Sequence, residues 1–269
     1  MTNDETQDPS VLELFDLGEK RALVTGASGY LGGALARALA EAGATVIVSS
    51  RELARAQAVA TSLPSKNDAR HHAIQMDHMD ETSIEHGFAE ALDRAGGLEI
   101  LVNNGHSPLA NDWTDVTGEQ FTRQLANATG YFLLARRMRD HAVERKASAS
   151  VIMLGSMYGL VGSYPDAYED ICPASPVAYH TLKGGIVHLT RHLAVYWAQD
   201  QIRVNCLSPG PFPPPRVPRE MVQRLCGHSP MGRMGLPHEL KGAVVFLASD
   251  ASSYMTGQNL VIDGGWTAW

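Results

Sequence analysis

The chain has 269 residues, of which 44% are hydrophobic and 19% charged, and 22 Lys and Arg against 29 Asp and Glu give a net charge of −7. This ordinary globular composition excludes a collagen-like or disordered chain. The acidic balance argues against a nucleic-acid partner, and the absence of an 18-residue apolar run argues against a membrane span. We therefore expect neither a nucleic-acid nor a membrane partner.

Two features favour a cytoplasmic protein. The N-terminal residues Met1–Glu5 are polar and acidic, unlike a secretory signal. Three widely separated cysteines, Cys172, Cys206 and Cys226, are an odd number, which fits reduced thiols better than a disulfide framework. We expect all three to be small core or surface residues.

Short apolar runs rich in β-branched residues alternate with longer segments whose apolar residues recur every three or four positions. The predicted strands are Arg21–Thr25, Thr45–Ser49, His72–Met76 (the weakest), Ile100–Asn103, Ser150–Gly155, Ile202–Leu207 and Asn259–Asp263. This alternation predicts right-handed βαβ units and a parallel sheet with helices on both faces. We therefore predict one α/β domain over residues 17–269, a Rossmann-type doubly wound parallel sheet of about seven strands, preceded by a polar extension over residues 1–16.

The first predicted strand runs into a glycine-rich turn, Thr25–Gly32, and a helix follows at once. Glycines at such a turn let the backbone approach a pyrophosphate, whose charge then lies at the positive end of the helix. A tight turn without a ligand would use the same residues, but the place after the first strand favours a dinucleotide site. The residues expected at the phosphates are Gly26, Ser28, Gly29, Tyr30, Leu31 and Gly32.

The end of the second predicted strand, Ser49-Ser50-Arg51, lies where such a site meets the adenosine ribose. An Asp or Glu there would bind both ribose hydroxyls and repel a 2′-phosphate, whereas Arg accommodates that phosphate. Ser50 and Arg51 therefore predict NADP(H) as the preferred cofactor, with NAD(H) as the second possibility. The alternative is that Arg51 only begins the next helix and faces solvent.

Tyr179 and Lys183 are four residues apart in a predicted helix and so share one helical face. A phenol with a pKa of about 10 exchanges protons poorly at neutral pH, and a nearby ammonium favours the phenolate. Tyr179 could then exchange a proton with a carbonyl or alcohol oxygen while a hydride moves at carbon. Ser156 ends the preceding strand, where its hydroxyl could hold the substrate oxygen. Taken alone, such a Tyr/Lys pair is usually an exposed helix face, and Ser156 a turn residue.

In order and context these motifs resemble those of the short-chain dehydrogenases/reductases, from about Leu17 to Trp266. The matching residues are Thr25–Gly32, Asp77, Asn103-Asn104-Gly105, Asn127, Ser156, Tyr179, Lys183, Ile202–Asn205, Ser208-Pro209-Gly210, Thr256–Gln258 and Asp263–Gly265. The resemblance implies an NAD(P)-dependent oxidoreductase that interconverts a secondary alcohol and a ketone by hydride transfer. It also implies a homo-oligomer, either a tetramer or a dimer.

The resemblance further implies roles for single residues. Tyr179 would be the acid/base, and Lys183 would lower its pKa and bind the nicotinamide ribose. Ser156 would orient the carbonyl, and Asn127 would hold a water molecule that relays the proton. The other cofactor contacts implied are Asp77 at the adenine, Asn103 at the adenine-side ribose, and Gly105, Pro209, Gly210 and Phe212.

Three features depart from the family's pattern. The glycines have the spacing of the longer, extended branch, and Tyr30 stands where the short branch has glycine. His106 replaces the glycine of the usual Asn-Ala-Gly and places an imidazole near the cleft. Pro211–Pro215, within a stretch to Pro218 expected to be a rigid loop, stands where the family often has a threonine that touches the nicotinamide carboxamide.

The stretch over residues 161–176 makes the separation of Ser156 and Tyr179 longer than the family pattern predicts. It carries polar and aromatic residues beside the expected cleft entrance, where loops set specificity, and it is similar to stretches in sugar- and polyol-acting relatives. We therefore predict a small-molecule substrate, namely a sugar, a polyol or a sugar acid. The alternative for this stretch is a loop that packs on a neighbouring subunit or only shields solvent.

Two other functions remain open at this point. A 3-oxoacyl thioester reductase would need a basic surface for its carrier, which the acidic charge disfavours. A non-catalytic nucleotide-sensing protein of the same fold would have no need of Asn127, Ser156, Tyr179 and Lys183 together. No metal site is expected, because His188 and His192 have no third ligand at a suitable spacing.

Overall fold

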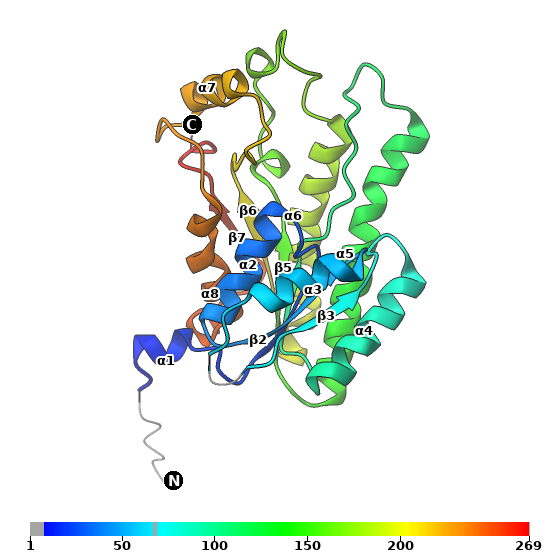
Figure 1. Ribbon diagram of the computed structural model, residues 1–269, viewed down its shortest axis with the longest axis vertical. Helices are drawn as coiled ribbons and strands as arrows, with labels where there is room; N and C mark the ends of the chain where they lie inside the picture. The colour runs from blue at the N-terminus through cyan, green and yellow to red at the C-terminus, as the bar shows by residue number, and fades with distance from the viewer. Residues whose placement is uncertain (1–7, 67–68, 269) are drawn as a thin grey trace.

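Seven parallel strands form one sheet in the order β3-β2-β1-β4-β5-β6-β7 (Figure 1). The computed structural model describes residues 8–66 and 69–268. The strands are β1 (Arg21–Val24), β2 (Thr45–Ser50), β3 (His72–Gln75), β4 (Ile100–Asn103), β5 (Ala149–Leu154), β6 (Ile202–Pro209) and β7 (Asn259–Ile262). Each predicted strand is present. Continuous apolar runs of this length are typical of parallel strands that are buried on both faces of a sheet. The strand order reverses direction between β1 and β4, which opens a ligand site at their carboxyl ends.

Helices cover both faces of this sheet and bury two separate cores. One layer holds α2 (Tyr30–Glu41), α3 (Leu53–Ser62) and α8 (Lys241–Ala248), and the other holds α4 (Glu81–Ala95), α5 (Gly118–Glu144) and α6 (Val177–Trp197) (Figure 1). Short helical turns are η1 (Met157–Gly159), η2 (Pro165–Ala167), η3 (Ala198–Asp200), η4 (Pro237–Leu240) and η5 (Asp250–Ser252). The predicted doubly wound α/β fold is confirmed.

The N-terminal extension contains a helix that the prediction of a polar segment missed. Residues 1–7 of that segment lie outside the described residues, but α1 (Val11–Phe15) follows them. The Ser10 hydroxyl accepts a hydrogen bond from the Glu13 N–H, and the Glu13 carboxylate accepts one from the Ser10 N–H. This reciprocal cap was readable from the Ser-x-x-Glu spacing. The Phe15 ring lies 6.3 Å from that of Phe246 on α8, so the helix rests on the domain.

The stretch over residues 161–176 packs within its own chain. It lies beside α7 (Arg219–His228), which stands near the C-terminal end at the top of Figure 1 and follows the Pro211–Pro218 loop. The Arg224 guanidinium donates to the carbonyl oxygens of Asp166 and Glu169, and His228 Nε2 lies 3.0 Å from the Asp166 carboxylate. The stretch is therefore fixed from the side of α7.

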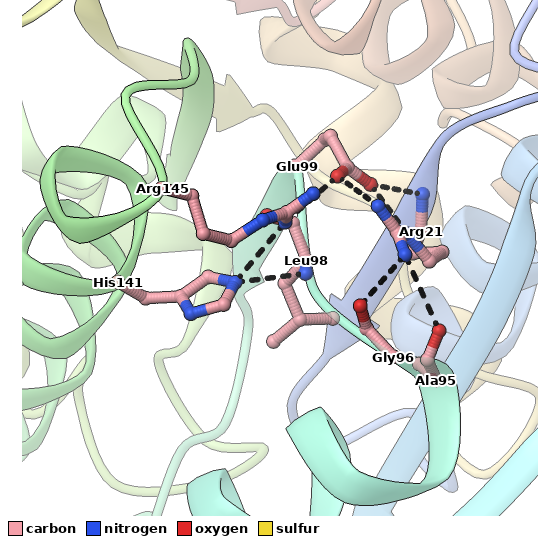
Figure 2. A network of polar contacts seen from close by, with 7 residues as sticks. All are labelled: Arg21, Ala95, Gly96, Leu98, Glu99, His141 and Arg145. Atoms are coloured by element: carbon pink, nitrogen blue, oxygen red, sulfur yellow. Dashed lines mark hydrogen bonds and ion pairs between the residues drawn. The ribbon is translucent and has the colours of Figure 1, made fainter.

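At the amino ends of the strands, the Glu99 carboxylate lies between two guanidinium groups (Figure 2). Arg21 Nε donates to it over 2.9 Å and Arg145 Nη1 over 3.1 Å, while Arg21 also donates to the Gly96 carbonyl at the end of α4. Burial by itself would raise the pKa of Glu99, but the hydrogen bonds from Arg21 outweigh it and lower the pKa. This network joins β1 and β4 to α4 and α5.

Glu99→Gln is expected to lower the free energy of unfolding by about 1–3 kcal/mol at pH 7, since it leaves two partly buried guanidinium groups without their anion. Because the pKa of Glu99 is lower in the folded state, its contribution is present above pH 4.5 and is lost as the pH falls through the folded-state value. Denaturant unfolding at neutral and acidic pH checks this. The control Glu90→Gln, which breaks an exposed pair with Arg94, should change stability by less than about 0.5 kcal/mol. A Glu99→Gln effect of equal size at both pH values would contradict the assignment.

Candidate active site

A cleft of about 510 Å³ opens at the carboxyl ends of the strands, beside the paired strands β1 and β4 where the strand order reverses. Ligands bind at this place in doubly wound sheets because the strand connections separate there. The predicted site residues that line it are Gly26, Ser28, Gly29, Tyr30, Leu31, Gly32, Ser50, Arg51, Gly105, Ser156, Tyr179, Lys183, Pro209, Gly210 and Phe212. The predicted residues Asp77, Asn103 and Asn127 do not line it.

The glycine-rich turn has the geometry that a pyrophosphate needs. Gly26 has a φ of +62°, and a Cβ there would lie 2.9 Å from the Gly105 Cα, so only glycine fits. Gly29 caps α2 without a side-chain hydrogen bond, which leaves the first amides of the helix to a ligand. The Asn104 amide donates to the carbonyl oxygens of Thr25 and Gly26 and holds the turn in place. These residues fit the phosphates of a dinucleotide.

Basic side chains gather at the end of the cleft that is predicted to meet the adenosine. Ser50 Oγ lies 3.1 Å from Ser28 Oγ, and Arg51 lines the cleft beside it. Glu52 and Arg55 also line the cleft. Arg55 Nη1 lies 3.6 Å from Glu52 Oε1, so the negative charge of Glu52 is paired with the positive charge of Arg55. The sequence prediction missed Arg55, which lies in the first turn of α3, whereas Arg51 precedes that helix, so no helical spacing links the two.

Asn103 and Asp77, which are predicted to contact the adenosine, do not line the cleft. The Asn103 side chain is fully buried, and its Nδ2 donates to the Tyr131 carbonyl oxygen, so the side chain points into the core rather than the cleft. Asp77 is partly buried, and its carboxylate accepts a hydrogen bond from the Met79 N–H. His78, the residue after Asp77, does line the cleft.

Tyr179, Lys183 and Ser156 meet at the other end of the cleft. Lys183 Nζ donates to the Leu154 carbonyl oxygen over 2.6 Å and lies 5.6 Å from the centre of the Tyr179 ring. Burial lowers the pKa of Lys183 to about 8. Burial raises the pKa of Tyr179, and the Ser156 hydroxyl only partly offsets this. Because its pKa is raised, the Tyr179 phenol is protonated at neutral pH and ready to donate.

Comparison with known proteins agrees with this geometry. A family model described as enoyl-(acyl carrier protein) reductase matches residues 26–267. A short-chain type dehydrogenase/reductase from Mycobacterium marinum superposes with a TM-score of 0.85 and is 36% identical over 97% of this chain and 100% of its own. The chain belongs to the short-chain dehydrogenase/reductase family. It is accordingly an NAD(P)-dependent oxidoreductase that acts on CH–OH groups.

Two further relatives of this short-chain dehydrogenase/reductase carry more specific names. A galactitol 2-dehydrogenase from Rhizobium johnstonii is 35% identical over 97% of this chain and 100% of its own. A gluconate 5-dehydrogenase from Burkholderia cenocepacia, solved in complex with NADP and tartrate, is 28% identical with a TM-score of 0.84, over 97% of this chain and 100% of its own. Both align over nearly the whole of this chain.

Asn127, the remaining predicted catalytic residue of this family member, lies behind the cleft wall on α5 and is fully buried. Its amide is completely hydrogen bonded, with Oδ1 accepting from the Ser107 N–H and from His78 Nε2, both over 2.8 Å. His106 lies in the cleft, with its ring edge-to-face against Tyr179 at 5.4 Å. Burial lowers the pKa of His106 to about 3, so its imidazole is neutral.

Two further features concern residues 8–66 and 69–268 of the chain. No helix there is long and apolar enough to cross a membrane. No group of three or more His, Cys, Asp and Glu side chains in those ranges could hold a metal ion.

Proposed function

We propose that this enzyme interconverts a secondary alcohol and a ketone on a sugar, polyol or sugar acid, with NADP(H) as its preferred cofactor. The observation that carries the proposal is the meeting of Ser156, Tyr179 and Lys183 at one end of a cleft whose other end is built for a dinucleotide. When bound, the cofactor supplies or accepts the hydride. The chain supplies the proton and the positions of the reacting groups.

The surroundings of each side chain indicate its proposed role in the reaction. The protonated Tyr179 phenol donates its proton to the carbonyl oxygen during reduction and takes it back during oxidation. The Ser156 hydroxyl donates a hydrogen bond to the same oxygen, where negative charge develops. The Lys183 ammonium, held by the Leu154 carbonyl oxygen, stabilises the phenolate that remains. Asn127, by its place on α5, is proposed to hold the water that returns the proton.

The proposed cofactor contacts follow the cleft from end to end. The turn Gly26–Gly32 and the amides at the start of α2 bind the pyrophosphate, with Gly105, Pro209, Gly210 and Phe212 toward the nicotinamide. Asp77 is proposed to meet the adenine, and Asn103 could reach the ribose only with its backbone, given its buried side chain. Ser50 and Arg51 bind the 2′-phosphate.

Arg51→Ala is expected to weaken NADPH binding by about 10-fold to 100-fold and to change NADH binding by less than about twofold, since a hydrogen bond to a charged group contributes roughly 1.5–3 kcal/mol. Fluorescence titration of both reduced cofactors measures this. Arg37→Ala, on the outer part of α2 beside Glu41, serves as the control and should leave both affinities unchanged. Tighter binding of NADH than of NADPH by the natural protein would overturn the cofactor assignment.

The substrate class is supported by the polar character of the cleft around Tyr179 and by the names of the relatives. His106 is neutral, lines the cleft and lies against the reacting phenol, and Gln124 Nε2 lies 3.4 Å from His106 Nε2, so a polar ring stands beside Tyr179. Galactitol and gluconate are the substrates named for two similar proteins. A panel of hexitols, pentitols and aldonates with both oxidised cofactors tests the class.

A 3-oxoacyl thioester reductase is the second candidate, because the matching family model is described by an acyl-carrier substrate. The net charge of −7 disfavours docking of an acidic carrier protein. A 3-oxoacyl thioester in the same panel separates the two candidates. Faster turnover of the thioester than of every polyol and aldonate would favour the reductase.

We also propose that the chain forms a homo-oligomer, either a tetramer or a dimer, in the cytoplasm. Exposed apolar side chains support the assembly, with Val195 and Tyr196 on α6 and Tyr254 after η5 standing in solvent. The three cysteines are all free, which suits a reducing compartment. A solution mass equal to one chain would contradict the assembly.

A further inference from the structure

His78 fills a tightly confined place in the wall of the cofactor cleft. It follows β3 in the loop before α4, and its side chain is 8% exposed. Two glycines make room for it. A Cβ on Gly105 would lie 2.9 Å from His78 Nδ1, and a Cβ on Gly130 would collide with the His78 carbonyl oxygen. The imidazole therefore lies between the cleft wall and α5, with little freedom to turn.

The hydrogen bonds around Asn127 decide which nitrogen of His78 carries the proton. The Ser107 backbone N–H can only donate, so the Asn127 atom 2.8 Å away is the amide oxygen. The Asn127 amide nitrogen donates in turn to the Gln124 carbonyl oxygen, which agrees with this orientation. The same Asn127 oxygen lies 2.8 Å from His78 Nε2, and two acceptors cannot bond each other. Nε2 is thus the protonated nitrogen, and Nδ1 bears a lone pair.

Burial, together with nearby cations, keeps the ring of His78 neutral. Burial lowers the pKa of His78, the hydrogen bond to Asn127 and the charge of Asp77 act in the opposite direction, and the cations Arg51 and Lys183 lower the pKa further. Among the described residues, His78 Nδ1 receives no hydrogen bond, and it faces Gly105 in the cleft wall. A buried imidazole of this kind offers an acceptor to a ligand that carries a donor.

We propose that His78 positions Asn127 through Nε2 and accepts a hydrogen bond at Nδ1 from a hydroxyl or amino group of the bound dinucleotide. His78 then connects the cofactor directly to the residue proposed to hold the relay water. It is a positioning residue for the reaction and a contact residue for the cofactor. The kinetic consequence rests on the proposed function, whereas the tautomer and the cofactor contact do not.

The ¹⁵N resonances of the imidazoles test the tautomer and the contact without any turnover. The chain has 11 histidines, and the His78→Gln variant identifies the signals of His78. We expect a neutral ring protonated at Nε2, a change of the Nε2 signal in Asn127→Ala, and a change of the Nδ1 signal on saturation with NADPH. The proposal would be overturned if the ring is protonated at Nδ1, or if the two ¹⁵N resonances of His78 do not change on saturation with NADPH.

Kinetics and cofactor binding test the consequence. His78→Leu is expected to lower kcat by about tenfold and to weaken NADPH binding by about fivefold, each the size of one lost hydrogen bond. His78→Gln, whose amide can still donate to Asn127, should recover most of kcat. In the Asn127→Ala background, His78→Leu should lower kcat by less than about twofold, because the partner is already gone.

The control His86→Leu lies on the exposed side of α4 and should change neither quantity. Thermal unfolding of each variant shows whether it folds. If the effects of His78→Leu and Asn127→Ala on kcat multiply in the double variant, the two residues act independently, which would contradict the positioning role. If the natural protein turns over no compound in the substrate panel, the proposed function fails, and the resonances and the NADPH affinity still decide the role of His78.

Discussion

Tyr179→Phe is expected to lower kcat by about 10²-fold to 10⁴-fold while leaving NADPH affinity within about twofold of the natural value. The substitution removes one oxygen atom, and with it the proton that the carbonyl oxygen must receive. The ring stays, so its packing against His106 and its distance from the Lys183 ammonium are retained. Steady-state rates and fluorescence titration of the cofactor measure the two effects separately.

A matched control comes from the same helix. Tyr196 on α6 is 63% exposed and far along the helix from the cleft, so Tyr196→Phe should leave kcat unchanged. Turnover within about tenfold of the natural rate in Tyr179→Phe would show that another group moves the proton. Loss of cofactor binding in that variant would instead indicate a role in holding the dinucleotide.

Lys183→Met is expected to abolish measurable turnover and yet to stabilise the fold at pH 7. Burial lowers the pKa of Lys183 from 10.5 to about 8, so keeping the ammonium charged in the folded state costs roughly 3 kcal/mol at neutral pH. Methionine has a similar length and no charge. The lost hydrogen bond to the Leu154 carbonyl oxygen offsets part of the gain, which leaves about 1–2 kcal/mol.

The pH dependence identifies the cause of this gain. Because the folded-state pKa is below that of the unfolded chain, the cost is complete below pH 8 and disappears as the pH rises from 8 to 10.5. Thermal unfolding at pH 7 and pH 9.5 should therefore show a larger advantage of Lys183→Met at pH 7. The control Lys241→Met breaks a surface pair with Glu41 and should change stability by less than about 1 kcal/mol. A variant less stable than the natural protein at pH 7 would show that the ammonium contributes net stability.

Much of the fold could be predicted because its signals are local. Buried strands of four to eight residues need continuous apolar runs, and the runs at β4 and β5 are buried along their whole length. Ser156 and Tyr179 could be placed together because both follow the carboxyl end of β5, where a parallel sheet binds ligands. The other predicted site residues were placed by the order of their motifs along the chain.

Other features depend on contacts between distant segments and could not be predicted. The direction of the Asn103 side chain depends on the Tyr131 carbonyl oxygen, 28 residues away. His78 bonds to Asn127, 49 residues away, and no spacing rule links the two. Arg216 lines the cleft from the proline-rich loop, and only the folded path of that loop brings it there. Helix α1 was predictable in principle from its cap, but the polar composition outweighed that signal.

In the proposed reaction, Tyr179 and a bound nicotinamide cofactor together reduce a carbonyl on a hydroxylated carbon chain. Reduction of ketoses and keto-aldonates with NADPH deuterated at the transferring position of the nicotinamide tests it most directly, with mass analysis of the alcohol product. We expect one deuterium on the new carbinol carbon for each NADPH consumed, and product formation by Tyr179→Phe that is slower by about 10²-fold to 10⁴-fold. Product without deuterium, or unimpaired deuterium transfer by Tyr179→Phe, would contradict it.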